Sequence, residues 1–134
     1  MKKVWVNGSF DVLHIGHIKL LEYASTLGKV TVGLDSDKRI SSKKGKNRPY
    51  NNLIDRIGFL KSIKYIQSII PFNSDIQLSN IIKEYQPDYM VIGSDYKDKR
   101  VIGCEYAKQI IFFDRIPDKS TTAILEYEKD YSHR

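Results

Sequence analysis

The sequence predicts an α/β protein built on a doubly wound sheet of five parallel strands. Five short apolar segments, rich in Val and Ile, recur along the chain, and segments with helical spacing of apolar residues lie between them. Strands that alternate with helices form a parallel sheet through right-handed crossovers, with helices on both faces. The expected fold is therefore Rossmann-like. With 134 residues the chain has the length of one domain, which we expect to span residues 1–134.

The elements are placed by apolar runs and by the glycines that end them. The expected strands are residues 4–8, 30–34, 67–72, 89–93 and 110–113. The expected helices are residues 16–27, 52–63, 75–84, 103–108 and a last one from about Ser120. Residues 38–48 are mostly polar and basic, and we expect a loop there. The polar carboxyl-terminal tail, residues 126–134, is either helical or frayed. In such a sheet the ligand site lies at the carboxyl ends of the strands.

Composition excludes several classes of protein. Hydrophobic residues make up 41% of the chain and charged residues 28%, which is ordinary for a globular protein. No apolar run approaches the roughly 20 residues of a membrane helix, and the first residues lack the pattern of a signal peptide. Cys104 is the only cysteine, which excludes an internal disulfide and a thiolate metal cage. We expect a cytoplasmic protein with no membrane partner.

The net charge of +6 raises the possibility of a nucleic-acid partner. Six cations fall within residues 38–48, but Ser, Gly and Asn separate them, whereas surfaces that bind single strands interleave cations with aromatic rings. The stretch is either a solvated basic loop or a loop that closes over a polyphosphate. The motifs described next favour the second interpretation, so we expect no nucleic acid.

The segment GSFDVLHIGH, residues 8–17, is the most informative part of the sequence. Its two histidines are three positions apart at the start of a helix, where such residues share one face. Gly16 between them removes a side chain that would hold a phosphate away from the backbone. The helix start adds unpaired N–H groups and the positive end of the helix dipole. His14 and His17 are therefore expected to face one anionic ligand.

These residues resemble the HxGH signature of the HIGH-motif nucleotidyltransferases, a cytidylyltransferase-like family. KKGKNRP at residues 43–49, Arg56, PDYMVIGSDY at residues 87–96 and RIPDKSTTAI at residues 115–124 follow in the order and spacing of bacterial sugar-phosphate and glycerol-phosphate members. The resemblance covers nearly the whole chain. It implies in-line attack of a substrate phosphate on the α-phosphate of a nucleoside triphosphate, with pyrophosphate leaving and no covalent enzyme intermediate.

The resemblance also implies roles for individual residues. His14, His17 and Lys44 are the expected catalytic groups, and Arg56 is expected to contact substrate phosphate, although an exposed helix position is the alternative for Arg56. The expected nucleotide contacts are Gly8, Ser9, Phe10, Gly16, Lys46, Gly93, Asp95, Arg115, Ser120, Thr121 and Thr122. Mg²⁺ is expected to arrive with the triphosphate, since the sequence shows no cluster of metal ligands. We expect a homodimer whose substrates are a nucleoside triphosphate and a small phosphorylated sugar or polyol.

Two subfamilies and one other class of function are open. KGKNRP, Arg56 and PDYMVIGSDY are most similar to the adenylyltransferase that makes ADP-heptose, and we favour this interpretation. Arg115, five residues before the Ser-Thr-Thr run, instead has the spacing of glycerol-3-phosphate cytidylyltransferases. The other class is a non-catalytic domain that binds a nucleotide or nucleic acid. The intact trio of His14, Gly16 and His17 argues against it.

Overall fold

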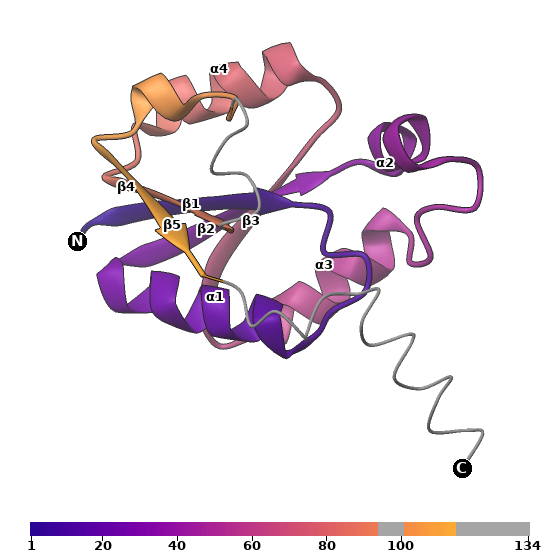
Figure 1. The fold of residues 1–134 in the computed structure, drawn as a ribbon, viewed down its shortest axis with the longest axis horizontal. Coiled ribbons are helices and arrows are strands. Elements are labelled where there is room, and N and C mark those ends of the chain that lie inside the picture. Colours follow the sequence, from indigo (N-terminus) through magenta and orange to yellow (C-terminus); the bar gives the residue numbers. More distant parts are fainter. Residues whose placement is uncertain (94–100, 115–134) are drawn as a thin grey trace.

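The computed structural model describes residues 1–93 and 101–114, and these form a parallel sheet of five strands in the order β3-β2-β1-β4-β5 (Figure 1). The strands are β1 (Lys3–Gly8), β2 (Lys29–Asp35), β3 (Ile66–Phe72), β4 (Tyr89–Gly93) and β5 (Gln109–Phe113). The helices are α1 (Ile15–Leu27), α2 (Asp37–Lys44), α3 (Leu53–Lys61), α4 (Asp75–Tyr85) and the short 3₁₀ turn η2 (Cys104–Tyr106). The predicted Rossmann-like fold class is confirmed.

Helices cover both faces of the sheet, so the core has two halves (Figure 1). On one face α1 and α3 pack against the sheet, where Val4 and Val6 of β1 are buried. On the other face α4 and η2 pack around Trp5, which is completely buried. Successive side chains of a strand point to opposite faces, and a strand covered on both sides is apolar on both. This explains why β1 is a continuous apolar run rather than an alternating one.

The basic stretch differs from the predicted loop. Its first part is the helix α2, whose N-cap Ser36 accepts a hydrogen bond from the backbone N–H of Arg39 at 3.2 Å. Ile40 is the one buried residue of α2, so the apolar periodicity that indicates a helix is missing. The helix ends at Lys44 and is followed by the C-cap Gly45, which adopts a φ of 104° that favours glycine.

The other described helices and strands lie where the sequence predicts them, with small changes in their bounds. The helix expected over residues 103–108 is only a single 3₁₀ turn. The last expected helix and the tail of residues 126–134 lie outside the described residues. Among the helices that the structure describes, none has the length and apolar composition needed to cross a lipid bilayer.

Gly33 of β2 is required by the packing of the core around Trp5. It pairs with Asn7 of β1, and a Cβ atom added to Gly33 would overlap the Trp5 ring at Cζ2. The ring is enclosed on all sides and has no room to move away. Any side chain at position 33 therefore displaces the largest residue of this half of the core.

We predict that Gly33→Ala lowers the free energy of unfolding by about 1–3 kcal/mol, the usual cost of overpacking a core. Gly58→Ala is the matched control, because the space around Gly58 in α3 is open. Alanine is the better helix former, so the control should raise stability by up to about 1 kcal/mol. Chemical denaturation of both variants measures the difference. Equal stability of Gly33→Ala and the wild type would contradict the packing described here.

Candidate active site

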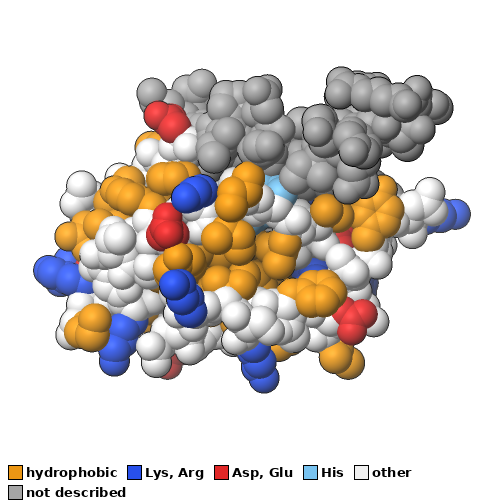
Figure 2. All heavy atoms as spheres, turned by 90° about the horizontal axis from the view of Figure 1, so that it is seen from below, with side chains coloured by type: hydrophobic (Ala, Val, Ile, Leu, Met, Phe, Trp, Pro, Cys, Tyr) orange, Lys and Arg blue, Asp and Glu red, His pale blue; other side chains and the backbone are white. Residues whose placement is uncertain are grey.

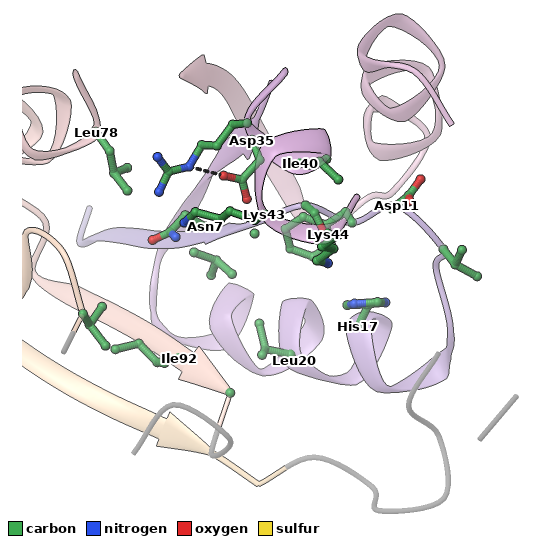
Figure 3. Close-up of a pocket in the computed structure, with 18 of the residues that line it drawn as sticks. Asn7, Asp11, His17, Leu20, Asp35, Ile40, Lys43, Lys44, Leu78 and Ile92 are labelled. Carbon is green, nitrogen blue, oxygen red and sulfur yellow. Dashed lines mark hydrogen bonds and ion pairs between the residues drawn. The ribbon is translucent and has the colours of Figure 1, made fainter. Parts of the chain in front are cut away.

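A pocket of about 530 Å³ opens at the carboxyl ends of β1, β2 and β4 (Figure 3). From β1 the chain adds β2 and β3 on one side of the sheet, and it then adds β4 and β5 on the other side. The order therefore switches direction at β1, between β2 and β4. In open α/β sheets ligands bind at such a switch point, outside the carboxyl ends of the strands. The walls come from the loop after β1, the first turns of α1, and parts of α2 and α4. The pocket thus lies at the edge of the sheet where the sequence predicts a ligand site.

His14 and His17 build the turn at which α1 begins. His14 is the N-cap, and its Nδ1 accepts a hydrogen bond from the backbone N–H of Gly16 at 3.0 Å. The Nδ1 of His17 accepts one from the backbone N–H of His14 at 3.2 Å. The ring centroids are 3.9 Å apart, so the imidazoles share one face as their spacing predicts. Because each Nδ1 is an acceptor, the proton of each neutral ring is assigned to Nε2.

The loop after β1 holds the second histidine in place. His17 lines the pocket, whereas His14 is nearly buried beside it. The buried Phe10 has a φ of 47°, which is uncommon for a residue other than glycine, and its ring centroid lies 5.2 Å from that of His17. A Cβ atom on Gly8 would lie 3.2 Å from the Phe10 ring. The small residue at position 8 therefore lets Phe10 lie against the first turn of α1.

Lys44, the last residue of α2, brings a positive charge to the pocket. Its Nζ donates a hydrogen bond to Ser9 Oγ at 3.3 Å, and both residues line the pocket. The side chain as a whole is exposed, yet its ammonium group is partly desolvated. This desolvation, together with the charge of Arg48, lowers the pKa of Lys44, and the carboxylates of Asp11 and Asp35 oppose the shift.

Asp11 fastens the chain after α2 to the loop after β1. The buried carboxylate accepts hydrogen bonds from Arg48 Nε at 2.9 Å and from the backbone N–H groups of Tyr50 at 2.9 Å and Asn51 at 2.8 Å. Burial alone raises the pKa of Asp11, but these hydrogen bonds and the charge of Arg48 outweigh it, so the pKa lies below its ordinary value. Asp11 is thus a charged anchor at neutral pH.

Arg56, the predicted phosphate contact, lies inside the protein. Its side chain is completely buried and does not line the pocket. Nη1 donates to the backbone oxygens of Ser9 at 3.0 Å and Asp35 at 2.7 Å. Nε donates to the backbone oxygen of Asn51 at 2.9 Å, and Nη2 to Asp37 Oδ1 at 2.6 Å. Four of its N–H groups are therefore engaged. In this arrangement Arg56 links the chain segments that surround the pocket and does not face the space where a substrate phosphate would bind.

The pocket gathers most of the predicted site residues that the structure describes. The residues that line it are Gly8, Ser9, Phe10, Gly16, His17, Lys44 and Gly93. Lys46 is exposed and does not line it. Five predicted nucleotide contacts lie outside the described residues, namely Asp95, Arg115, Ser120, Thr121 and Thr122.

Several lining residues were not predicted from the sequence. Asn7, Asp35 and Arg39 line the pocket as well. Asp35 directly follows the apolar run of β2, and a polar residue at the carboxyl end of a parallel strand is a signal that could have identified it. Within residues 1–93 and 101–114, no three His, Cys, Asp or Glu side chains are grouped as metal ligands.

Comparison with known proteins identifies the family. A model of the cytidylyltransferase-like family matches residues 5–126. The chain belongs to the cytidylyltransferase-like family. The family match, together with the relatives described next, identifies this domain as a nucleotidyltransferase.

The curated relatives of this cytidylyltransferase-like domain are much longer proteins. It is 42% identical over 124 residues to the bifunctional protein HldE of Nitratiruptor sp., and 40% identical over 123 residues to that of Campylobacter fetus subsp. fetus. These matches cover 92% and 91% of this chain but only 27% of each relative. The chain thus spans about a quarter of the length of these relatives.

Two solved structures share this fold. A lipopolysaccharide core biosynthesis protein from Thermoplasma volcanium is 23% identical with a TM-score of 0.66, over 87% of this chain and 96% of that one. A protein from Archaeoglobus fulgidus, described as having unknown function, is 18% identical with a TM-score of 0.68, over 88% and 93% of the two chains. At these identities the likeness concerns the fold alone.

We predict that Arg56→Lys lowers the free energy of unfolding of the cytidylyltransferase-like domain by about 3 kcal/mol or more, because a lysine cannot replace four directed hydrogen bonds and leaves buried acceptors unpaired. Arg48→Lys is the control, since Arg48 is partly exposed and its Asp11 partner keeps two backbone donors. Denaturation curves of both variants measure the effect. A stable Arg56→Lys protein with a raised KM for a phosphorylated substrate would instead support the prediction that Arg56 contacts substrate phosphate.

Proposed function

We propose that this domain transfers AMP from ATP to the phosphate of a heptose-type sugar 1-phosphate and releases pyrophosphate. The observation that carries the proposal is the histidine turn at the start of α1, which borders a pocket that also receives the ammonium group of Lys44. Neutral imidazole donors, a helix start and a cation around one cavity suit a polyphosphate that gains negative charge during the reaction.

The chemistry follows from positioning and charge. An oxygen of the acceptor phosphate attacks the α-phosphorus, the bond from that phosphorus to the bridging oxygen breaks, and the electron pair leaves with pyrophosphate. Donors on His14 and His17 stabilise the charge that builds on the phosphate oxygens. Lys44 offsets the charge of the two approaching anions, which would otherwise repel each other. No side chain has to form a bond to phosphorus.

The Mg²⁺ is part of the substrate in this proposal. Asp11 uses its carboxylate oxygens to hold Arg48 and two backbone N–H groups, and Asp35 is paired with Arg39 at 2.6 Å. Neither carboxylate belongs to a cluster of ligands among the described residues. Mg²⁺ commonly keeps several water molecules and binds substrate phosphates, which fits an ion that enters with ATP.

The positions of the basic residues weigh against a nucleic-acid partner. Arg39 and Arg48 of the basic stretch turn inward to pair with Asp35, Asp75 and Asp11. On the face covered by α1 and α3, Lys and Arg side chains are scattered between hydrophobic and neutral ones (Figure 2). A nucleic-acid surface is expected to carry a continuous basic patch or stripe.

The choice of ATP and a heptose-type acceptor rests on similarity. The motifs KGKNRP and PDYMVIGSDY resemble the ADP-heptose adenylyltransferases, and the relatives named above are HldE proteins. The second candidate is CTP with glycerol 3-phosphate, which the spacing of Arg115 and Ser120 favours. Both candidates use the same chemistry at the α-phosphate. They differ in the base and in the group that carries the acceptor phosphate.

We predict that His17→Ala and His14→Asn each lower kcat by about a hundredfold or more, the scale reported for the loss of one oxyanion donor. Asparagine is a good N-cap, so His14→Asn keeps the cap of α1 while it removes the imidazole. His14→Ala, which removes both, should in addition lose about 1 kcal/mol of stability. Pyrophosphate release and thermal unfolding measure the two effects separately. A folded His14→Asn enzyme with wild-type turnover would exclude His14 from catalysis.

We predict a clear preference for ATP with heptose 1-phosphate when pyrophosphate release is measured across ATP, CTP, GTP and UTP. Each nucleotide is paired with sugar 1-phosphates and with glycerol 3-phosphate, and kcat/KM values are compared. The base must be selected by hydrogen bonds to its edge, because apolar pockets discriminate poorly between groups of similar size. Preferred turnover of CTP with glycerol 3-phosphate would overturn the proposed substrates. Absence of turnover with every pair would overturn the proposed reaction.

A further inference from the structure

The carboxyl ends of the strands divide the pocket into two sides, one on each face of the sheet. Asn7 pairs with Gly33 in the parallel register, and Asp35 lies two residues after Gly33. Residues two apart on a strand point to the same face, so Asn7 and Asp35 both lie on the face covered by α4. In Figure 3, Asn7, Asp35 and Leu78 lie on one side of the pocket and His17 on the other. The histidine turn of α1 belongs to the opposite face of the sheet.

The amide of Asn7 is held in one orientation. The indole Nε1 of Trp5 donates a hydrogen bond to Asn7 Oδ1 at 3.1 Å. Trp5 is completely buried and lies against the backbone of Gly33, so this donor cannot turn away. With Oδ1 engaged by the indole, the amide NH₂ group is left to supply donors to the pocket that Asn7 lines.

The carboxylate of Asp35 is also fixed. Its Oδ1 accepts a hydrogen bond from Arg39 Nε at 2.6 Å, and Arg39 Nη2 pairs with Asp75 at 2.6 Å. The Arg39 guanidinium lies over the Phe72 ring, 5.2 Å from its centroid, and the side chain is only 9% exposed. Both Asp35 and Arg39 line the pocket. Because Arg39 is bound to both Asp35 and Asp75, it holds the Asp35 carboxylate in place. The second oxygen, Oδ2, is then an acceptor in a fixed position.

The mixture of groups on this side fits neutral hydroxyls better than phosphate. Asp35 in the pocket lining, and Asp75 outside it, pair with Arg39 and offset its charge, whereas a phosphate site needs an excess of donors and positive charge. A carboxylate repels phosphate but accepts a hydrogen bond from a hydroxyl, and an amide NH₂ group donates to the oxygen of one. Leu78 and Ile102 add apolar surface beside these polar groups.

We propose that Asn7, Asp35 and Arg39 form a subsite that binds hydroxyl groups of the acceptor's sugar and thereby sets acceptor specificity. The inference rests on the proposed function, because it assumes that the acceptor carries a sugar. Asp35 accepts from one hydroxyl, and Asn7 donates to that hydroxyl or its neighbour. The acceptor phosphate then points toward Lys44 and His17, on the side where the triphosphate reacts. An acceptor without these hydroxyls leaves the fixed polar groups unpaired and binds poorly.

Steady-state kinetics of Asp35→Asn test the subsite. Asparagine keeps the shape of the side chain but turns one acceptor oxygen into a donor. With ATP and heptose 1-phosphate, we expect the acceptor KM to rise about tenfold or more, with most of the loss in this KM rather than in kcat or the KM for ATP. Asp55→Asn, on the exposed first turn of α3, is the matched control and should behave as the wild type. Asn7→Ala is a second variant that leaves the ion pair of Asp35 and Arg39 intact.

Monodeoxy analogues of the acceptor make the test specific. In the wild type, the analogue that lacks the hydroxyl bound by Asp35 should lose at least about tenfold in kcat/KM, and this loss should largely vanish in Asp35→Asn. An active wild type with an unchanged acceptor KM in Asp35→Asn, or with the same deoxy penalty in both proteins, would overturn the subsite and leave the proposed reaction standing. A wild type that uses glycerol 3-phosphate and no sugar 1-phosphate would overturn both.

Discussion

The buried guanidinium of Arg56 is the interaction on which the geometry of the site depends. It joins the carboxyl end of β1 at Ser9, the end of β2 at Asp35, the first turn of α2 at Asp37 and the chain before α3 at Asn51. A buried charge is costly unless its hydrogen bonds are satisfied, so these four segments must stay together for the fold to tolerate it. Arg56 and Ser9 are 47 positions apart in the chain. One side chain therefore fixes the distance between segments that sequence separates widely.

Asp11 complements this arrangement with the opposite charge. Its carboxylate gathers Arg48 and two backbone N–H groups, and Asn51 Nδ2 returns a hydrogen bond to the backbone oxygen of Asp11 at 2.6 Å. Asn51 is also a partner of Arg56, so the two anchors meet at one residue. The chain between α2 and α3 is thus held to the loop after β1 at two points, directly by Asp11 and through Arg56 at Ser9. Lys44, at the end of α2, contacts Ser9 of the same loop.

Sequence alone predicted the elements whose signals are local. The apolar runs of β1, β2 and β4 and the His14 and His17 pair needed no tertiary information. Helix α2 was missed because Ile40 is its only buried residue, although Ser36 before it and Gly45 after it are ordinary helix boundaries. The burial of Arg56 had a signal, because Arg56 lies on the same helical face as Leu53 and Leu60. Its partners had none, because they come from separate segments of the chain.

The histidine turn links the fold to the chemistry through the protonation state of the rings. As N-cap of α1, His14 must offer a lone pair on Nδ1 to the N–H of Gly16, and His17 must offer one to the N–H of His14. A proton on Nδ1 of either ring would turn that atom into a donor and break the hydrogen bond it accepts. The two hydrogen bonds therefore place the proton of each neutral ring on Nε2. In that state a ring can still donate to a phosphate oxygen, so the hydrogen bonds that start the helix also prepare the donors that the proposed reaction requires.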